Sequence, residues 1–167
     1  MSATPKLDPI ANLRDVSLSG HTRKSLRRLD RISASFGTGF TALIGPSGAG
    51  KTSALNILSG FEKPESGSVK LPTRVGWAPS DGALWPHLNA REHITAVAPN
   101  SPDLADELLG AFSLSECAHS KPTQLSEGER DRLAIARALA NTRGSKDSIT
   151  VLDEPLAHVE STKRRTY

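Results

Sequence analysis

Residues 45–52 carry the side-chain types and spacing that can bind a polyphosphate. They read Gly-Pro-Ser-Gly-Ala-Gly-Lys-Thr and match the pattern G-x-x-x-x-G-K-[ST]. The glycines let the backbone curl so that its N–H groups point at phosphate oxygens. Lys51 would reach the β- and γ-phosphates of ATP, and the Thr52 hydroxyl would ligate Mg²⁺. We therefore predict a nucleotide-binding loop that consists of Gly45, Pro46, Ser47, Gly48, Ala49, Gly50, Lys51, Thr52 and Ser53.

Two carboxylates follow the apolar run 149–152 near the end of the sequence. At the carboxyl end of a buried strand, Asp153 would complete the Mg²⁺ shell opposite Thr52. Glu154 is placed to polarise a water for in-line attack on the γ-phosphoryl group, so it is the predicted catalytic residue. An acidic pair after apolar residues is common by itself. Together with the phosphate loop, however, it indicates nucleotide–Mg²⁺ chemistry.

The elements that must position these residues are predicted from hydrophobic spacing and capping signals. Strands are predicted at residues 13–19, 32–36, 40–44, 68–71, 74–78 and 149–152. Helices are predicted at 51–59, from the Asn89 cap to before Pro99, from Ser101-Pro102 onward, and at 127–141. The basic stretch 21–31 is predicted to be a solvated hairpin or loop. This order of elements indicates an α/β fold with a mainly parallel sheet.

Length and composition limit the remaining possibilities. With 167 residues and a net charge of +3, the chain favours one domain, and its charge is too weak to argue for a nucleic-acid partner. A lone cysteine, Cys117, excludes an internal disulfide and favours a reducing cytoplasm. The sequence shows neither a membrane span nor a secretory signal, so we expect any work at a membrane to go through a partner.

Residues 125–139 read Leu-Ser-Glu-Gly-Glu-Arg-Asp-Arg-Leu-Ala-Ile-Ala-Arg-Ala-Leu. This stretch resembles the signature segment of ABC-type ATPases, and residues 45–52, 83–94 and 153–156 match the same family in the same order. The resemblance implies signature residues that face the ATP of a partner domain. On this sequence they are Leu125, Ser126, Glu127, Gly128 and Glu129.

The family resemblance implies a fold, a function and partners. The fold would be a P-loop NTPase core with a small antiparallel β region at the N-terminus and a small helical subdomain at about 82–140, all in one domain spanning 1–167. The chain would be the ATP-binding subunit of an ABC transporter, which binds Mg-ATP and hydrolyses it to drive transport through separate membrane subunits. Two such domains would dimerise head to tail, as a homodimer or a heterodimer. They would lie in the cytoplasm, peripheral on the inner face of the membrane, with no nucleic acid.

Several positions depart from the family pattern. Ser80 stands where a glutamine is usual, and Glu127 and Glu129 replace a glycine and a glutamine. No aromatic residue suited to stack on adenine lies near residues 19–21, and the family's switch histidine lies beyond Tyr167. Two alternatives therefore stay open: a nucleotide-binding module with little turnover, degenerate or truncated, or a soluble non-transport ABC ATPase.

The signature itself predicts competition for a helix end. Ser126 and Glu129 form a capping box, and Glu127 adds a second carboxylate to the same first turn. A carboxylate there would repel the γ-phosphate of a partner's ATP. We therefore hypothesise a weak sandwich dimer with slow hydrolysis. Trp85 has two interpretations, an anchor for a membrane partner or ordinary packing between subdomains.

Overall fold

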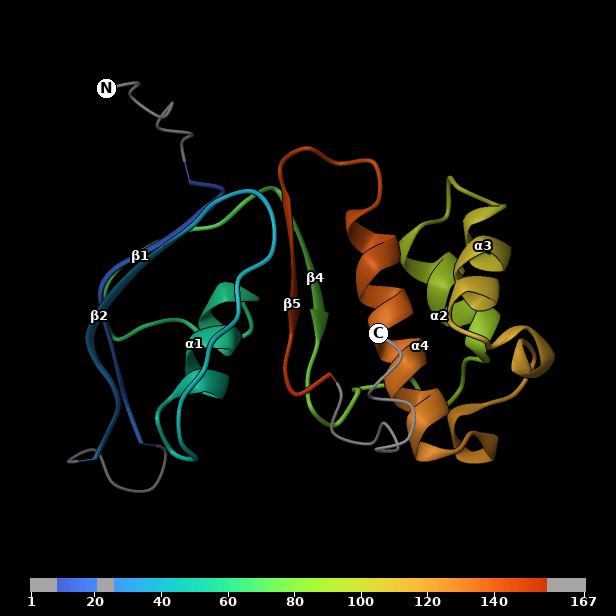
Figure 1. The fold of residues 1–167 in the computed structure, drawn as a ribbon, viewed down its shortest axis with the longest axis horizontal. Coiled ribbons are helices and arrows are strands. Elements are labelled where there is room, and N and C mark those ends of the chain that lie inside the picture. Colours follow the sequence, from blue (N-terminus) through green and yellow to red (C-terminus); the bar gives the residue numbers. More distant parts are fainter. Residues whose placement is uncertain (1–8, 21–25, 156–167) are drawn as a thin grey trace. The chain divides into compact units, whose positions relative to one another are not determined.

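The computed structural model describes residues 9–20 and 26–155 (Figure 1). Its strands are β1 (Ala11–Ser19), β2 (Arg27–Phe36), β3 (Ser66–Lys70), β4 (Arg74–Ala78) and β5 (Ser148–Leu152). Its longer helices are α1 (Lys51–Leu58), α2 (Ala90–Val97), α3 (Leu104–Ala111) and α4 (Glu127–Thr142). The chain divides into two compact units, one of Met1–Val75 with Lys146–Ile149 and one of Gly76–Ser145 with Thr150–Tyr167.

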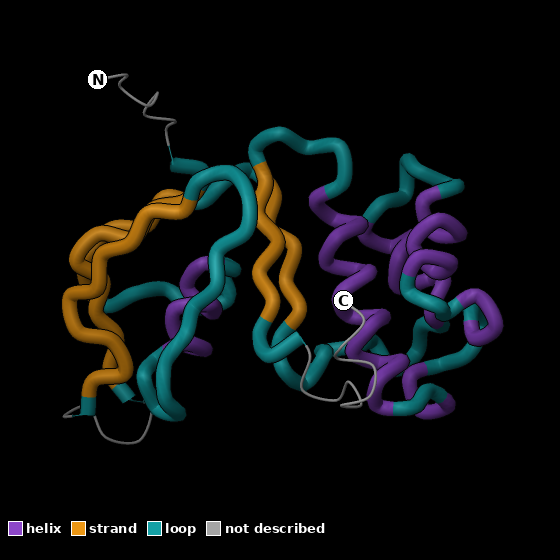
Figure 2. Tube along the Cα trace, in the orientation of Figure 1, coloured by secondary structure: helices purple, strands orange, loops and turns teal. Residues whose placement is uncertain are grey.

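The first unit contains an antiparallel sheet with strand order β2-β1-β3 (Figure 2). The apolar residues Leu13, Val16 and Leu18 of β1 are buried. Bulges interrupt the ladder near Asp15, whose φ is 51°. Its N–H group donates instead to Ser33 Oγ at 2.9 Å. The predicted antiparallel region at the N-terminus is thus present.

Helix α1 follows the phosphate loop without a break. Its apolar residues Ala54, Ile57 and Leu58 lie at helical spacing and are buried. The helix ends where Gly60, with a φ of 74°, donates its N–H to the Ile57 carbonyl. This agrees with the helix predicted at 51–59.

Strands β4 and β5 form a two-stranded sheet and run in parallel. The N–H of Arg74 donates to the carbonyl of Asp147 at 3.3 Å, and the N–H of Asp153 donates to that of Ala78 at 3.0 Å. The residues at the start of β4 thus pair with those at the start of β5, and the residues at the two strand ends also pair, so the strands are parallel. A Cβ added to Gly76 would lie 2.1 Å from the Ala138 carbonyl oxygen, so α4 packs against β4 at a distance that only glycine permits.

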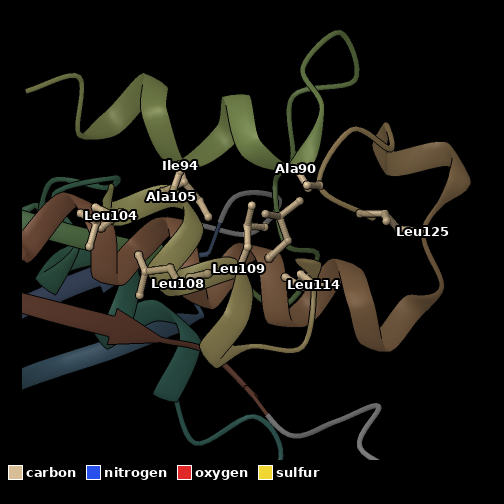
Figure 3. Packing of buried hydrophobic residues seen from close by; sticks show 12 residues of the cluster. Ala90, Ile94, Leu104, Ala105, Leu108, Leu109, Leu114 and Leu125 are labelled. Carbon is tan, nitrogen blue, oxygen red and sulfur yellow. The ribbon is translucent and has the colours of Figure 1, made fainter. Parts of the chain in front are cut away.

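The second unit has its own core between α2, α3 and α4 (Figure 3). Both predicted capping boxes are present, one of Asn89 with Glu92 at the start of α2 and one of Ser126 with Glu129 at the start of α4. Helix α3 begins at Leu104, behind Asp103, rather than at the Ser101-Pro102 step. The core cluster consists of Ala90, Ile94, Leu104, Ala105, Leu108, Leu109, Leu114, Ala118, Leu125, Leu133, Ala136 and Ala140.

One prediction about a strand is wrong. Residues 40–44 form no strand, and Phe40 and Ile44 are 93% and 92% exposed. Apolar composition alone cannot make a strand, because a strand also needs a neighbour for its N–H and C=O groups, and no strand of the described residues pairs with this segment. The stretch 21–31, predicted as a hairpin or loop, is partly strand. β2 begins at Arg27 rather than at the predicted residue 32, since Leu29 and Arg27 pair with Leu18 and Ser19 of β1. Residues 21–25 of that stretch lie outside the described residues.

In residues 9–20 and 26–155, helices fall short of the length and apolar character that a bilayer span requires.

Candidate nucleotide-binding site

The predicted phosphate loop winds around the side chain of Lys51. Its Nζ donates hydrogen bonds to the carbonyl oxygens of Gly45 and Pro46, both at 2.9 Å. Gly48 and Gly50 have φ values of 79° and 86°, which turn the backbone back on itself. The ammonium group thus lies inside the loop, bound to oxygen atoms that phosphate oxygens could replace.

Gly50 joins the loop to both α1 and the antiparallel sheet. It is the N-cap of α1, and a Cβ there would lie 2.7 Å from the Arg28 carbonyl oxygen and 2.8 Å from Leu29 Cδ2. Thr52 and Ser53 occupy the first turn of the helix, and Ser53 is buried. Free N–H groups at this helix end carry partial positive charge, so the cradle suits an anion.

The carboxylates Asp153 and Glu154 lie in the second unit of the chain. Asp153 is only 6% exposed. Glu154 is exposed and has a φ of 50°, a left-handed conformation that strains a residue other than glycine. Both line a pocket whose other walls are residues 78–80, Gly82, Asp131, Ala134, Ile135 and Pro155. Ser80 and Glu154 therefore share one pocket.

The oxygen donors suit Mg²⁺ only if the phosphates take part. Among residues 9–20 and 26–155, no group of three or more His, Cys, Asp or Glu side chains could hold a metal ion by itself. Mg²⁺ commonly takes one or two protein oxygens and completes its shell with water and phosphate. The Thr52 hydroxyl in the first unit and the Asp153 carboxylate in the second each offer one oxygen of the kind that Mg²⁺ prefers.

Two residues of α4 next to this pocket were not predicted from the sequence. Asp131 lines the pocket. Arg137 donates to backbone carbonyls of the loop that carries Ser80. Helical spacing offered a signal, because Asp131, Ala134 and Arg137 recur every three residues and so share one face of α4.

The signature segment forms the start of α4, and its carboxylates occupy that helix end. Glu129 accepts hydrogen bonds from the Ser126 N–H at 2.7 Å and from Ser126 Oγ at 2.8 Å. The backbone and side-chain hydrogen bonds from Ser126 lower the pKa of Glu129. Leu125 is buried in the helical core, and Glu127 and Gly128 are in the first turn. An ionised carboxylate is therefore bound at the N-terminus of α4.

Comparison with known proteins identifies the family of the chain. Residues 29–157 match the family model described as ABC transporter, and the chain belongs to this family, whose members bind ATP. Among its relatives is the Fe(3+) ions import ATP-binding protein FbpC 1 of Rhodococcus jostii (strain RHA1), 38% identical over 139 residues, which are 72% of this chain and 39% of that protein. The spermidine/putrescine import ATP-binding protein PotA of Protochlamydia amoebophila (strain UWE25) is 39% identical over 139 residues, with shares of 72% and 36%.

A solved structure shares the fold as well. A bacterial ABC transporter cassette, determined as a dimer, superposes with a TM-score of 0.79 at 26% identity and covers 93% of this chain and 78% of that one. The matched region spans only 39% of the length of the first relative named above. The fold is thus that of an ABC cassette, a P-loop NTPase with a small antiparallel sheet and a parallel sheet.

Proposed function

We propose that this chain is the ATP-binding subunit of an ABC transporter, and that it binds Mg-ATP and hydrolyses it to drive transport through separate membrane-spanning subunits. The observation that carries the proposal is the phosphate loop that encloses Lys51 at the start of α1. The names of the relatives, which are import ATP-binding proteins, support the transport role. We also propose that both units belong to one nucleotide-binding domain.

The phosphate loop and the carboxylates have distinct parts in the proposed reaction. The loop amides and Lys51 bind the phosphates, with Lys51 exchanging the Gly45 and Pro46 carbonyls for phosphate oxygens. Thr52 and Asp153 hold Mg²⁺, which when bound neutralises charge on the phosphates. Glu154 orients the attacking water and accepts its proton. Ser80 lines the same pocket and has one short hydroxyl for this work.

The proposal includes two kinds of partner. A second nucleotide-binding domain would place its signature residues, those at positions 125–129, against the ATP of this chain. The related cassette was determined as a dimer, which supports pairing of two such domains. Membrane subunits would dock near Trp85, which is 38% exposed. The chain would then lie on the inner face of the cell membrane.

A module that binds nucleotide with little turnover is the second candidate. Two observations favour it. The Ser80 side chain is short for a residue beside the attacking water. The Glu129 carboxylate also occupies the helix end that would bind a phosphate of the partner's ATP. A soluble ABC ATPase without a transport role is a third candidate function. Co-purification with a membrane subunit would distinguish the transport role from this third candidate.

Phosphate release by the purified chain tests the central claim. Relative to wild type, Lys51→Ala is expected to lower the ATPase rate by about 100-fold, because a charge-assisted contact to the phosphates is lost. Lys63→Ala, an exposed lysine of the same unit, is the matched control and should keep the wild-type rate. Equal rates for wild type and Lys51→Ala would exclude hydrolysis. If a fluorescent ATP analogue still bound wild type alone, the second candidate would stand.

A further inference from the structure

Arg137 lies buried in the middle of α4, where a charged side chain needs compensation. Only 7% of the residue is exposed, and burial lowers the pKa of its guanidinium group. The group nevertheless stays protonated in a protein. It donates hydrogen bonds to two backbone carbonyls, those of Ala83 at 2.7 Å and Gly82 at 3.0 Å. The burial of this cation is therefore coupled to the conformation of one loop.

That loop, residues 79–85, has a backbone that needs support. Gly82 and Ala83 have φ values of 71° and 40°, and the left-handed conformation is strained for a residue such as Ala83 that has a Cβ. Within the loop, the Gly82 N–H donates to the Pro79 carbonyl at 2.9 Å, and the Ala83 N–H donates to Asp81 Oδ1 at 3.2 Å. Arg137 binds the carbonyls of the two left-handed residues. Its hydrogen bonds thus offset the strain.

The end of the loop is fixed by Trp85 and His93. Arg137 Cζ lies 4.8 Å from the centroid of the Trp85 ring, and the His93 ring stacks on that ring with centroids 5.4 Å apart. The backbone N–H of Trp85 donates to His93 Nε2 at 2.8 Å, so this nitrogen must be unprotonated. His93 Nδ1 then donates to the Asn89 carbonyl at 2.8 Å. His93 is fully buried and neutral in this arrangement.

The same loop connects the Glu154 pocket with a surface residue. Ser80 and Gly82 line the pocket, while Trp85 is partly exposed. Ala134 of α4 also lines the pocket, one helical turn before Arg137. We propose that Arg137 is a positioning residue that fixes residues 79–85, so that the pocket wall beside Glu154 and the exposed Trp85 move as one body. As far as it concerns hydrolysis, this inference rests on the proposed function.

Amide hydrogen exchange tests the structural half of the proposal. Arg137→Lys keeps the positive charge but cannot bind both carbonyls as a fork. Loss of one or two hydrogen bonds should speed exchange of amides in residues 82–85 by about tenfold. The matched control is Arg132→Lys on the same helix, whose Nε donates to the Phe112 carbonyl at 3.0 Å and which should leave this segment unchanged. Unchanged exchange in Arg137→Lys would overturn the proposal.

Kinetics test the link to the pocket. Arg137→Lys is expected to lower kcat for ATP about tenfold while the Kd for a fluorescent ATP analogue stays within about twofold. A merely structural role would lower thermal stability without this split. Faster loop exchange with an unchanged kcat would overturn the link between loop and pocket. A wild-type chain that hydrolyses no ATP would contradict the proposed function alone, because hydrogen exchange still tests whether Arg137 fixes residues 79–85.

Trp85 fluorescence gives an independent readout. In a Trp77→Phe background, Trp85 is the remaining tryptophan. Arg137→Lys should raise quenching of Trp85 by acrylamide about twofold, because the indole loses a neighbour that covers its ring. Arg132→Lys should leave the quenching of Trp85 unchanged. Equal quenching in both variants would show that Arg137 does not hold Trp85.

Discussion

The phosphate loop and the Glu154 pocket are built in different ways. The loop comes from one continuous segment, residues 45–53, and its main hydrogen bonds run from Lys51 to carbonyls only five and six residues away. The pocket comes from three segments, residues 78–82, 131–135 and 153–155. A continuous cradle depends on local backbone geometry. An assembled pocket depends on packing between elements far apart in the sequence.

The two regions also differ in which residues adopt left-handed backbone conformations. Left-handed conformations in the loop belong to glycines, Gly48 and Gly50, for which they cost little. Around the pocket they belong to Gly82 but also to Ala83 and Glu154, and for the last two they are strained. Tertiary contacts must hold the second kind in place. We therefore expect changes in the loop to affect binding and changes around the pocket to affect turnover.

Glu154→Gln is the sharpest test of that difference. Loss of the proposed general base should lower the ATPase rate by about 100- to 10,000-fold, while the affinity for ATP stays near that of wild type. Phosphate release and titration with a fluorescent ATP analogue measure the two effects. Glu116→Gln, at an exposed glutamate of the same unit, should change neither. A parallel loss of affinity and turnover in Glu154→Gln would mean that the pocket also binds substrate.

Gly50→Ala tests the loop in the same way. The new Cβ would meet the Arg28 carbonyl oxygen at 2.7 Å in a backbone conformation that disfavours alanine. We expect a loss of about 2 kcal/mol in the free energy of unfolding and about a tenfold or greater loss of ATP affinity. Urea unfolding and analogue titration measure these. Gly39→Ala is the control: its φ is 101° but its Cβ meets nothing within 4 Å, so it should carry the strain without the loss of affinity.

Much of this architecture could be predicted from the sequence because the relevant signals are local. The capping boxes at Asn89 and Ser126 depend on residues three positions apart, and both are present. The phosphate loop and the strand before Asp153 likewise follow from short patterns. Local patterns do not predict whether a segment finds a neighbouring strand to pair with. Residues 40–44 have strand composition but no strand beside them in the part that the structure describes.

The positioning residues could not be found in that way. Arg137 contacts Gly82 and Ala83, more than fifty positions earlier in the sequence. A lone histidine such as His93 gives no sign from its neighbours that its ring will stack on Trp85. Such contacts exist only after the loop has folded against α4. The residues that hold the assembled pocket in place therefore could not be predicted from the sequence.

Acid pH should loosen the pocket region but not the loop. Burial lowers the pKa of His93, although the backbone hydrogen bond to Asn89 and the charge of Glu92 oppose the burial effect and Arg137 and His87 add to it. The unfolded chain therefore takes up a proton near pH 6.5 that the folded chain resists. Stability is fully present above that pH and is lost as pH falls below it, by at most about 1.4 kcal/mol per pH unit.

Urea unfolding of wild type and His93→Gln measures this effect. The amide side chain of the variant offers an acceptor and a donor that do not titrate, so the variant should lack the loss specific to His93. Between about pH 7.5 and about pH 5.5, wild type should lose about 1 kcal/mol more than the variant. Identical losses would show that the folded chain protonates His93 as readily as the unfolded chain.

The smallest expected effect concerns the start of α4, which is local like the phosphate loop but would act on a partner's nucleotide. Glu127 adds negative charge to a helix end that already binds the Glu129 carboxylate. In a Glu154→Gln background, Glu127→Gly should strengthen ATP-dependent dimerisation about twofold to fivefold, because charge near a helix end is worth about 0.3–1 kcal/mol. Glu127→Gln should do nearly the same without adding a helical glycine. Sedimentation with Mg-ATP measures the dimer. A tight dimer before either change would show that Glu127 does not repel the γ-phosphate.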